Sequence, residues 1–314
     1  MVAQIIDGRA HARSLITAVK ADIALLQAEK TNIGLATITV GTDYGSVAYE
    51  NRLRALAHKL GIPYEGYRLD ESTSEADLIN LVRKLNAEPD VSGILALRPL
   101  PAHIDEASIF KHLDPRKDIE SVHPENAGLL ALGVPRFVPS TAAAAFYLLD
   151  SWIDSTGANR ADFYHGANIV VIGRSNNVGK PAVSLGFARG AAVASIDEWA
   201  DRTTGVGRHT RRADVLIVAA GKAGLVKAEH VTENTVVIDV GINPMTDLDG
   251  RVRMVGDVDF EPVAARARAI TPVPGGVGPI TDVWLMSNTV SAARLLAVPS
   301  HTNPEFTEPL SEAS

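Results

Sequence analysis

The sequence predicts an α/β protein of two domains, with mostly parallel sheets covered by helices. Short apolar runs alternate with segments of helical periodicity, which is the pattern of βαβ units. A chain of 314 residues corresponds to two domains at roughly 100–200 residues per domain. Hydrophobic residues make up 46% of the chain and charged residues 21%, so a sizeable buried core can form.

In the first half, three short runs predict strands over Leu35–Val40, Tyr64–Leu69 and Ser92–Leu97. Two helices fit between them. Ser46–Leu60 carries valine and leucine at roughly helical spacing and ends before a glycine, and Ser74–Asn86 has its apolar side chains on one stripe.

The second half restarts the alternation after an irregular region. An alanine-rich helix reaches Trp152 and a polar stretch follows over Asp154–Asp162, so we place the domain boundary between about residues 131 and 162. A last helix over Thr281–Leu296 is expected to pack back onto the first domain. Four strands are predicted before it, with helices after the first and third of them: Ala167–Gly173, Ala191–Ile196, Asp214–Ala220 and Thr235–Gly241.

Composition excludes several classes of function. Lysine and arginine number 30 against 37 acidic residues, a net charge of −7, so neither nucleic acid nor an anionic membrane is an expected partner. Cysteine is absent, which removes thiol chemistry, and no metal site is expected. No apolar run is long enough to span a membrane and the start lacks a signal-peptide pattern, so we expect a cytoplasmic protein.

The strongest local signal is the run IGRSNNVGKP, which follows a predicted strand and opens a helix. Its glycines Gly173 and Gly179 allow a tight turn, and Arg174, Ser175 and Val178 lie between them. A turn of this kind can present backbone N–H groups and a helix N-terminus to a pyrophosphate. A plain strand-to-helix turn remains the alternative, because the run is a variant of the usual dinucleotide motif.

Two residues bear on which nicotinamide cofactor is used. Asp197 ends the next strand, about 20 residues on, where an acidic side chain can accept hydrogen bonds from a ribose 2′-hydroxyl. Arg174 indicates the opposite, since a guanidinium could bind a 2′-phosphate bidentately. The acid favours NAD, and we expect NAD over NADP.

Two further segments are typical of ligand-binding loops. The run TPVPGGVGPIT contains Pro274, Gly275 and Gly276, and its glycines and prolines make it both closely approachable and stiff. A rigid connector between domains is the alternative. The run VIDVGIN ends a buried strand at the carboxyl edge of the sheet, and we interpret its Asp239 as a structural carboxylate rather than a catalytic one.

These runs, together with GDVDF, closely resemble the methylenetetrahydrofolate dehydrogenase/cyclohydrolase family. The likeness extends through SVAY, GIL, PLP and KDIESVHP in the first half and covers about residues 1–297. It implies a folate-binding domain from residues 1–143 and 282–300, a Rossmann-like cofactor domain over 144–281, and a homodimer. The polar tail, 301–314, is expected to be disordered.

The chain departs from this family at its catalytic positions. The lysine that carries the family's cyclohydrolase step falls on Leu53, one helical turn after Tyr49, and the glutamine that supports it falls on Leu97. The family aspartate that holds the pterin is replaced by Glu120. Leucine cannot move protons, whereas hydride transfer needs orientation more than a proton carrier.

The resemblance therefore implies a nicotinamide-dependent dehydrogenase acting on 5,10-methylenetetrahydrofolate with cyclohydrolase activity weak or lost. Tyr49 would stack on the aminobenzoate ring, Glu120 would bind the pterin, and the proline-glycine loop would line the folate site. Gly221 and Ile242 would join the residues of the glycine turn in holding the cofactor, and His123 would be structural rather than a base. Two alternatives stay open: a family member recruited to a different substrate, and a catalytically silent binding paralogue.

Overall fold

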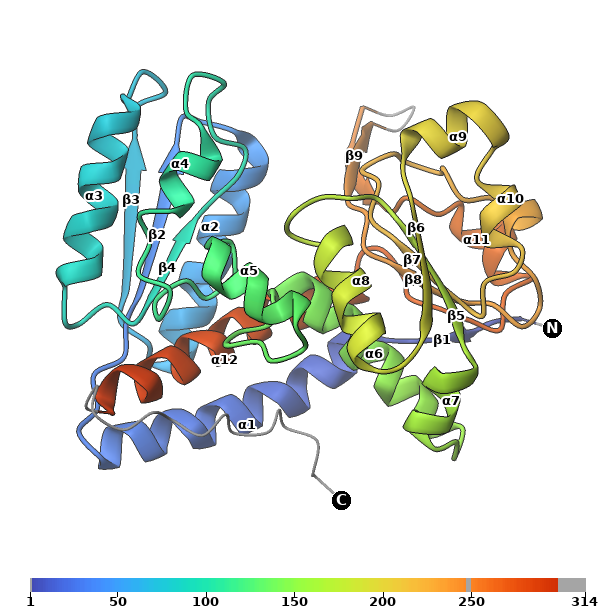
Figure 1. Ribbon diagram of the computed structural model, residues 1–314, viewed down its shortest axis with the longest axis horizontal. Helices are drawn as coiled ribbons and strands as arrows, with labels where there is room; N and C mark the ends of the chain where they lie inside the picture. Colours follow the sequence, from blue (N-terminus) through green and yellow to red (C-terminus); the bar gives the residue numbers. More distant parts are fainter. Residues whose placement is uncertain (1, 247–249, 299–314) are drawn as a thin grey trace. The chain divides into compact units, whose positions relative to one another are not determined.

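The computed structural model describes residues 2–246 and 250–298, and the predicted disordered tail, 301–314, lies outside them. The chain divides into two compact units (Figure 1). The larger unit comprises Met1–Ala21, Glu120–Val122 and Phe137–Asn288. The smaller unit comprises Asp22–Ile119, His123–Arg136 and Thr289–Ser314. Each unit contains its own parallel sheet.

The smaller unit contains a three-stranded parallel sheet in the order β3-β2-β4. The strands are β2 (Leu35–Val40), β3 (Tyr64–Leu69) and β4 (Gly93–Ala96), as the sequence predicts. The central strand β2 is buried along its whole length, which explains its continuous apolar run. The helices of this unit include α2 (Tyr44–Leu60), α3 (Glu75–Ala87), α4 (Glu106–Phe110) and α5 (Pro124–Ala131).

Helix bounds in this unit follow local capping chemistry. The Asp43 side chain accepts the N–H of Ser46 at the start of α2, and Gly61 ends the helix in the left-handed conformation, with φ of 75°. The Ser74 side chain accepts the N–H of Asp77 at the start of α3. The two predicted helices are therefore confirmed to within two residues at each end.

The larger unit contains a six-stranded parallel sheet in the order β1-β11-β8-β7-β5-β6. A two-stranded antiparallel ribbon, β9 (Asn243–Thr246) and β10 (Val252–Val255), lies between β8 and β11 in sequence. The six strands are β1 (Gln4–Ile5), β5 (Asn168–Ile172), β6 (Ala192–Ile196), β7 (Val215–Val218), β8 (Val236–Asp239) and β11 (Ala269–Ile270).

The helices of the larger unit include α6 (Ser140–Ser155), α7 (Arg160–Gly166), α8 (Gly179–Ala188) and α11 (Phe260–Ala264). The core of this unit is formed by strand residues such as Val170, Leu216 and Val237, each at most 1% exposed. The long helices α1 (Gly8–Ala28) and α12 (Val277–Ala297) each contribute residues to both units. The predicted last helix is thus confirmed, and it begins four residues earlier.

One predicted helix is wrong. Between β7 and β8, a segment that the structure describes throughout, the chain forms only the 3-10 turn η1 (Ala228–His230) and no α-helix. Gly221 and Gly224 both have positive φ in that segment, and this conformation interrupts a helix. Helices α9 (Glu198–Thr204) and α10 (Gly207–Thr210) instead follow β6, where the side chain of Asp197 caps the first turn of α9.

Candidate functional site

The glycine turn after β5 is packed directly against the end of β7. Gly173 has φ of 109°, and a side chain there would begin 2.1 Å from the carbonyl oxygen of Ala219. At Gly179 a side chain would begin 2.1 Å from the carbonyl oxygen of Gly173. Only glycine fits either position, so the close approach of two loops accounts for the motif.

The turn leads into the N-terminus of α8. The hydroxyl of Ser175 accepts the N–H groups of Val178 and Gly179 at 3.2 and 3.4 Å, which closes the turn. Val178, at the N-cap of α8, contributes no side-chain cap. This end of the helix carries partial positive charge and suits an anion such as a pyrophosphate.

The turn lies at the topological switch point of the six-stranded sheet. Strand β5 pairs with β6 on one side and with β7 on the other, so the connections on its two sides run in opposite directions. Ligands of open α/β sheets bind at the carboxyl ends of such strands. Gly221, in the loop after β7, is exposed there, and a side chain on it would contact nothing within 4 Å. Ile242, in the loop after β8, is 58% exposed.

Arg174 spans from the glycine turn to the end of β6. Its Nη1 donates to Asp197 Oδ2 at 2.7 Å, while its Nε and Nη2 donate to the hydroxyl and the carbonyl of Ser195 at 3.2 and 2.8 Å. The other Asp197 oxygen accepts the N–H groups of Trp199 and Ala200. Both oxygens of the acid that favours NAD therefore already have partners within the protein.

Two buried aspartates lie under the loops at this edge. Asp239 is 2% exposed and accepts the N–H groups of Gly241, Asp257 and Val258. Burial is the main reason that its pKa rises, to about 7, and the negative charge of Asp257 adds to the effect while the N–H donors oppose it. The interpretation of Asp239 as a structural carboxylate agrees with these three bonds.

The proline-glycine loop packs against the first turn of α1. A side chain on Gly8 would begin 1.8 Å from the carbonyl oxygen of Gly276, and one on Gly276 would begin 2.7 Å from Pro272 O. The N–H of Gly276 donates to Pro272 O at 2.8 Å, and Gly275 has φ of 117°. Pro274 follows a cis peptide bond. The loop is therefore closely packed within the larger unit.

Glu120 has a structural contact that its motif does not reveal. Its Oε1 accepts the N–H of Ser140 at 3.0 Å, at the start of α6. The N-cap position of that helix is Pro139, which supplies no side-chain bond, so Glu120 takes over the capping role. The next residue, Ser121, has φ of 52° and donates its hydroxyl to Phe137 O.

In the smaller unit, Leu53 and Leu97 are both buried, at 0% and 4% exposure. Leu53 lies on the inward face of α2, one turn after the half-buried Tyr49. The N–H of Leu97 donates to Ile38 O, which continues the pairing of β4 with β2. Neither position carries a group that can take up or release a proton.

Nearby arginines have other partners. The guanidinium of Arg52 lies 4.9 Å from the centre of the Tyr49 ring, and Arg54 pairs with the fully buried Glu50. Arg98 pairs with Glu106 at 3.0 Å and stacks on Phe110. None of these three arginines takes the place of a lysine at position 53.

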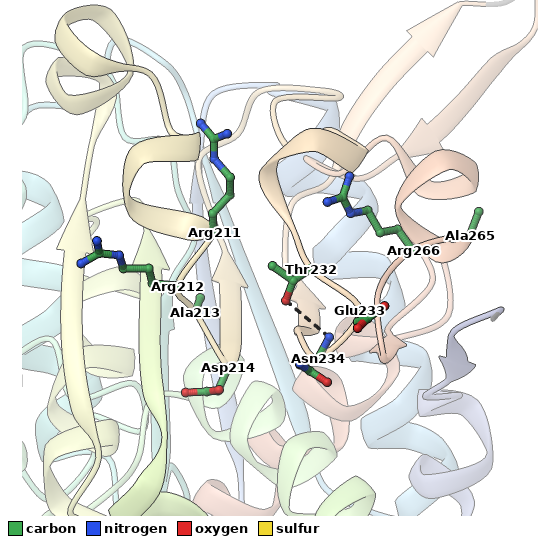
Figure 2. A pocket seen from close by; sticks show the side chains of 9 residues that line it. All are labelled: Arg211, Arg212, Ala213, Asp214, Thr232, Glu233, Asn234, Ala265 and Arg266. Atoms are coloured by element: carbon green, nitrogen blue, oxygen red, sulfur yellow. Dashed lines mark hydrogen bonds between the residues drawn. The ribbon is translucent and has the colours of Figure 1, made fainter.

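An open pocket of about 570 Å³ lies at the opposite edge of the larger sheet (Figure 2). It is formed where the chain enters β7, β8 and β11, at the amino ends of these strands, and so it lies away from the loops described above. Its walls are Arg211, Arg212, Ala213, Asp214, Thr232, Glu233, Asn234, Ala265 and Arg266.

Among residues 2–246 and 250–298, no group of three or more histidine or acidic side chains is arranged to hold a metal ion.

Two family models match the chain. The model for the tetrahydrofolate dehydrogenase/cyclohydrolase catalytic domain matches residues 6–120, and the model for the NAD(P)-binding domain of the same family matches residues 139–297. The chain belongs to this family. The tetrahydrofolate dehydrogenase/cyclohydrolase fold, with its two α/β units, agrees with the two-domain prediction.

Relatives from the same family match this chain over nearly its full length. Bifunctional protein FolD 2 of Rubrobacter xylanophilus is 55% identical over 307 residues, 97% of this chain and 96% of the relative. The FolD crystal structure from Campylobacter jejuni has a TM-score of 0.85 at 34% identity and covers 93% of this chain and 99% of its own. The Trypanosoma brucei FolD structure, complexed with NADP and an inhibitor, has a TM-score of 0.84 at 32% identity, covering 94% and 98%.

Three polar residues at the carboxyl edge of the six-stranded sheet were not predicted from the sequence as site residues: Ser195, Asn243 and Asp257. Ser195 lies two residues before Asp197, on the same side of its strand, so alternation along the strand could have indicated it. Asp257 lies in the GDVDF run, but its hydrogen-bond partners come from distant loops.

In the described part of the chain, no helix combines the length and apolar character needed to cross a membrane.

Proposed function

We propose that the protein oxidises 5,10-methylenetetrahydrofolate to 5,10-methenyltetrahydrofolate with NADP and has little or no cyclohydrolase activity. The observation that carries the proposal is the burial of two leucines, Leu53 and Leu97, where the family has a lysine and its supporting glutamine. The glycine turn and the proline-glycine loop of the larger unit keep the family pattern.

The dehydrogenase step makes modest demands on side chains. A hydride leaves the carbon that bridges N5 and N10, and the cation that remains is stabilised by those two nitrogens, so the protein mainly has to orient the substrate. Tyr49 is proposed to stack on the aminobenzoate ring. Glu120 is proposed to accept hydrogen bonds from the pterin, and Pro274, Gly275 and Gly276 to line the folate site.

The residues at the carboxyl edge of the larger sheet suit a nicotinamide dinucleotide. Backbone atoms fill the space beside Gly173 and Gly179, whereas a side chain on Gly221 would meet nothing within 4 Å, so the loop that follows β7 has open space beside it for a ligand. The bound cofactor would accept the hydride. Ser175, Val178 and Ile242 are proposed to complete its binding site.

NADP is proposed over NAD because of Arg174 and Ser195. The guanidinium is held at the end of β6, where a 2′-substituent of the adenine ribose is recognised in this fold class. Asp197 is paired with that guanidinium and caps α9. Its carboxylate is therefore less available to accept hydrogen bonds from a ribose 2′-hydroxyl than its position in the sequence indicates. This proposal replaces the expectation of NAD over NADP, which gave the position of Asp197 more weight than that of Arg174.

Cyclohydrolysis requires water activation and proton movement around a tetrahedral intermediate. A positioned acid or base typically accelerates such a step by about 10²–10⁴-fold, and leucine at positions 53 and 97 supplies none. Replacing both polar members of one network by apolar residues also avoids leaving an unpaired buried charge. The double replacement is therefore physically coherent.

A homodimer is proposed on the family resemblance. Strand β6 is an edge strand of the six-stranded sheet, and Ala192 and Ala194 on it are exposed, which suits pairing with a second copy. Light scattering coupled to size exclusion should give twice the mass of 33.3 kDa. A monomer at micromolar concentration would contradict this part of the proposal.

The experiment that tests the proposed activity is an initial-rate assay with 5,10-methylenetetrahydrofolate and each nicotinamide cofactor. Reduced cofactor should form with NADP at a kcat/KM at least about tenfold above that with NAD. Absence of reduced cofactor at millimolar substrate would refute the dehydrogenase proposal.

A further inference from the structure

The buried carboxylate of Asp257 accepts hydrogen bonds from the backbone of the loop that follows β7. Its Oδ2 accepts the N–H groups of Ala220 and Gly221 at 2.6 and 2.8 Å, and its Oδ1 accepts the N–H of Lys222 at 2.9 Å. Three consecutive N–H groups thus point at one side chain that is 0% exposed. The side chain of Asp257 therefore binds this loop at three successive backbone positions.

Asp257 is itself held by two further groups. The Asn243 side chain donates Nδ2 to Asp257 Oδ1 at 2.8 Å, and the N–H of Asp257 donates to Asp239 Oδ1 at 3.1 Å. Asp239 fixes the end of the same segment by accepting the N–H of Val258 at 3.0 Å. The two acids therefore join the loops that follow β7 and β8 to the 256–258 segment.

Two glycines leave the space that these carboxylates occupy. A side chain on Gly241 would begin 2.1 Å from Asp257 Cγ, and one on Gly256 would begin 1.8 Å from Asp239 Oδ2. The glycines of VIDVGIN and GDVDF are thus explained by the acids opposite them. Each run supplies one of these two buried acids and the glycine that makes room for the other.

We infer that Asp257 is a positioning residue for the nicotinamide cofactor, acting through the Ala220–Lys222 loop, with Asp239 and Asn243 holding it in place. The loop includes the exposed Gly221 and adjoins Ala219, whose carbonyl packs on Gly173 of the glycine turn. A shift of the loop would therefore disturb both walls of the proposed cofactor site. The inference rests on the proposed function, since it needs the cofactor at this edge.

The decisive variant is Asp257→Asn, which keeps shape but removes charge. Its amide nitrogen must face two of the four donors, so half of the hydrogen bonds are lost whichever way the amide is turned. We expect the dissociation constant for NADPH, measured by fluorescence, to rise about tenfold or more. Hydrogen exchange at the amides of residues 220–222 should become faster in the same variant.

Asp259→Asn is the matched control. Asp259 lies in the same GDVDF run, is exposed and makes no side-chain cap to α11, so its NADPH affinity should stay within about twofold of the wild type. In Asp257→Asn the KM for the cofactor should rise more than kcat falls, whereas a purely structural role would lower the fraction of folded protein and leave the affinity of that fraction unchanged.

Asn243→Ala is the second variant and decides the matter if Asp257→Asn does not fold. It removes one donor to Asp257 and should weaken NADPH binding about threefold with faster exchange at residues 220–222. NADPH affinity and loop exchange equal to wild type in a folded Asp257→Asn, or in Asn243→Ala where the first variant is unfolded, would overturn the inference. A wild-type protein that binds no nicotinamide cofactor would instead refute the proposed function itself.

Discussion

Arg174 and Asp197 form an ion pair at the carboxyl edge of β5 and β6, with Nη1 2.7 Å from Oδ2. The arginine comes from the glycine turn and the acid from the N-cap of α9. A ligand phosphate near this pair would meet a guanidinium already oriented by Ser195 and a carboxylate already paired with that guanidinium. The ion pair thus joins Arg174, which favours NADP, to Asp197, which favours NAD.

Replacing Arg174 with alanine should remove the preference for NADP. The charge-assisted bonds to a 2′-phosphate are lost and Asp197 is left without its ion-pair partner, so kcat/KM with NADP should fall about tenfold to a hundredfold while that with NAD changes little. Arg202→Ala is the matched control, because Arg202 pairs with Glu198 and stacks on Trp199 on the exposed side of α9. An equal loss with both cofactors would argue against recognition of the 2′-phosphate by Arg174.

Asp197→Ser isolates the contribution of the acid. Serine is also a favourable N-cap residue, so α9 should be preserved while the negative charge is removed and Arg174 is released. The ratio of kcat/KM for NADP over NAD should rise about threefold or more, because a like-charge neighbour of the phosphate is gone. A ratio that does not move would mean that the acid has no part in the choice of cofactor.

Leu53→Lys should destabilise the fold rather than restore the family activity. The side chain of Leu53 is fully buried, so an ammonium group placed there would lose its hydration. The buried acid one turn earlier, Glu50, already pairs with Arg54 and Arg68. The free energy of unfolding should therefore fall by about 3 kcal/mol. Leu53→Met, which nearly keeps volume and polarity, should cost less than about 1.5 kcal/mol. Urea unfolding of both variants measures the difference, and equal stability of the lysine and methionine variants would show that the site still accommodates a charge.

The raised pKa of Asp239 predicts a particular pH dependence of stability. The carboxyl has a pKa of about 7 in the folded protein against an ordinary value of 3.8, so between roughly pH 4 and 7 the folded state binds the extra proton. Stability from this group is therefore greatest below pH 4, falls as the pH rises through that window, and is constant above it. The loss should amount to about 4 kcal/mol.

Asp239→Asn removes the titration and so provides the comparison. The difference in unfolding free energy between variant and wild type should shift in favour of the variant as the pH is raised from about 5 to about 8. Taking the difference cancels the carboxylates that both proteins share. A difference that stays constant over this range would show that Asp239 does not carry the raised pKa.

Much of the fold is predictable because its signals are local. The apolar run of Leu35–Val40 and the caps of α2 and α3 lie within a few residues of the elements they define. The helix predicted after β7 is wrong because the periodicity there is weaker than the effect of two glycines with positive φ. Helix α9 is missed because Asp197 is interpreted from the sequence as a ribose ligand, although it is also an N-cap.

The candidate site is less accessible from the sequence because its contacts join distant segments. Gly173 could be recognised from its motif, but its collision partner is Ala219, 46 residues away. Asp257 bonds to residues 35 to 37 positions earlier in the chain, and Glu120 caps a helix that begins 20 residues later. No spacing rule connects such pairs, and the sheet topology alone brings them together.

A progress curve that follows reduced cofactor and the methenyl compound together tests the central claim most directly. With 5,10-methylenetetrahydrofolate and NADP, both signals should rise in equal amounts, and the methenyl compound should then decay at the rate it shows without protein. Reduced cofactor accompanied by methenyl decay that accelerates in proportion to protein concentration would contradict the loss of cyclohydrolase activity. Absence of both signals, with the protein folded, would contradict the assignment as a dehydrogenase.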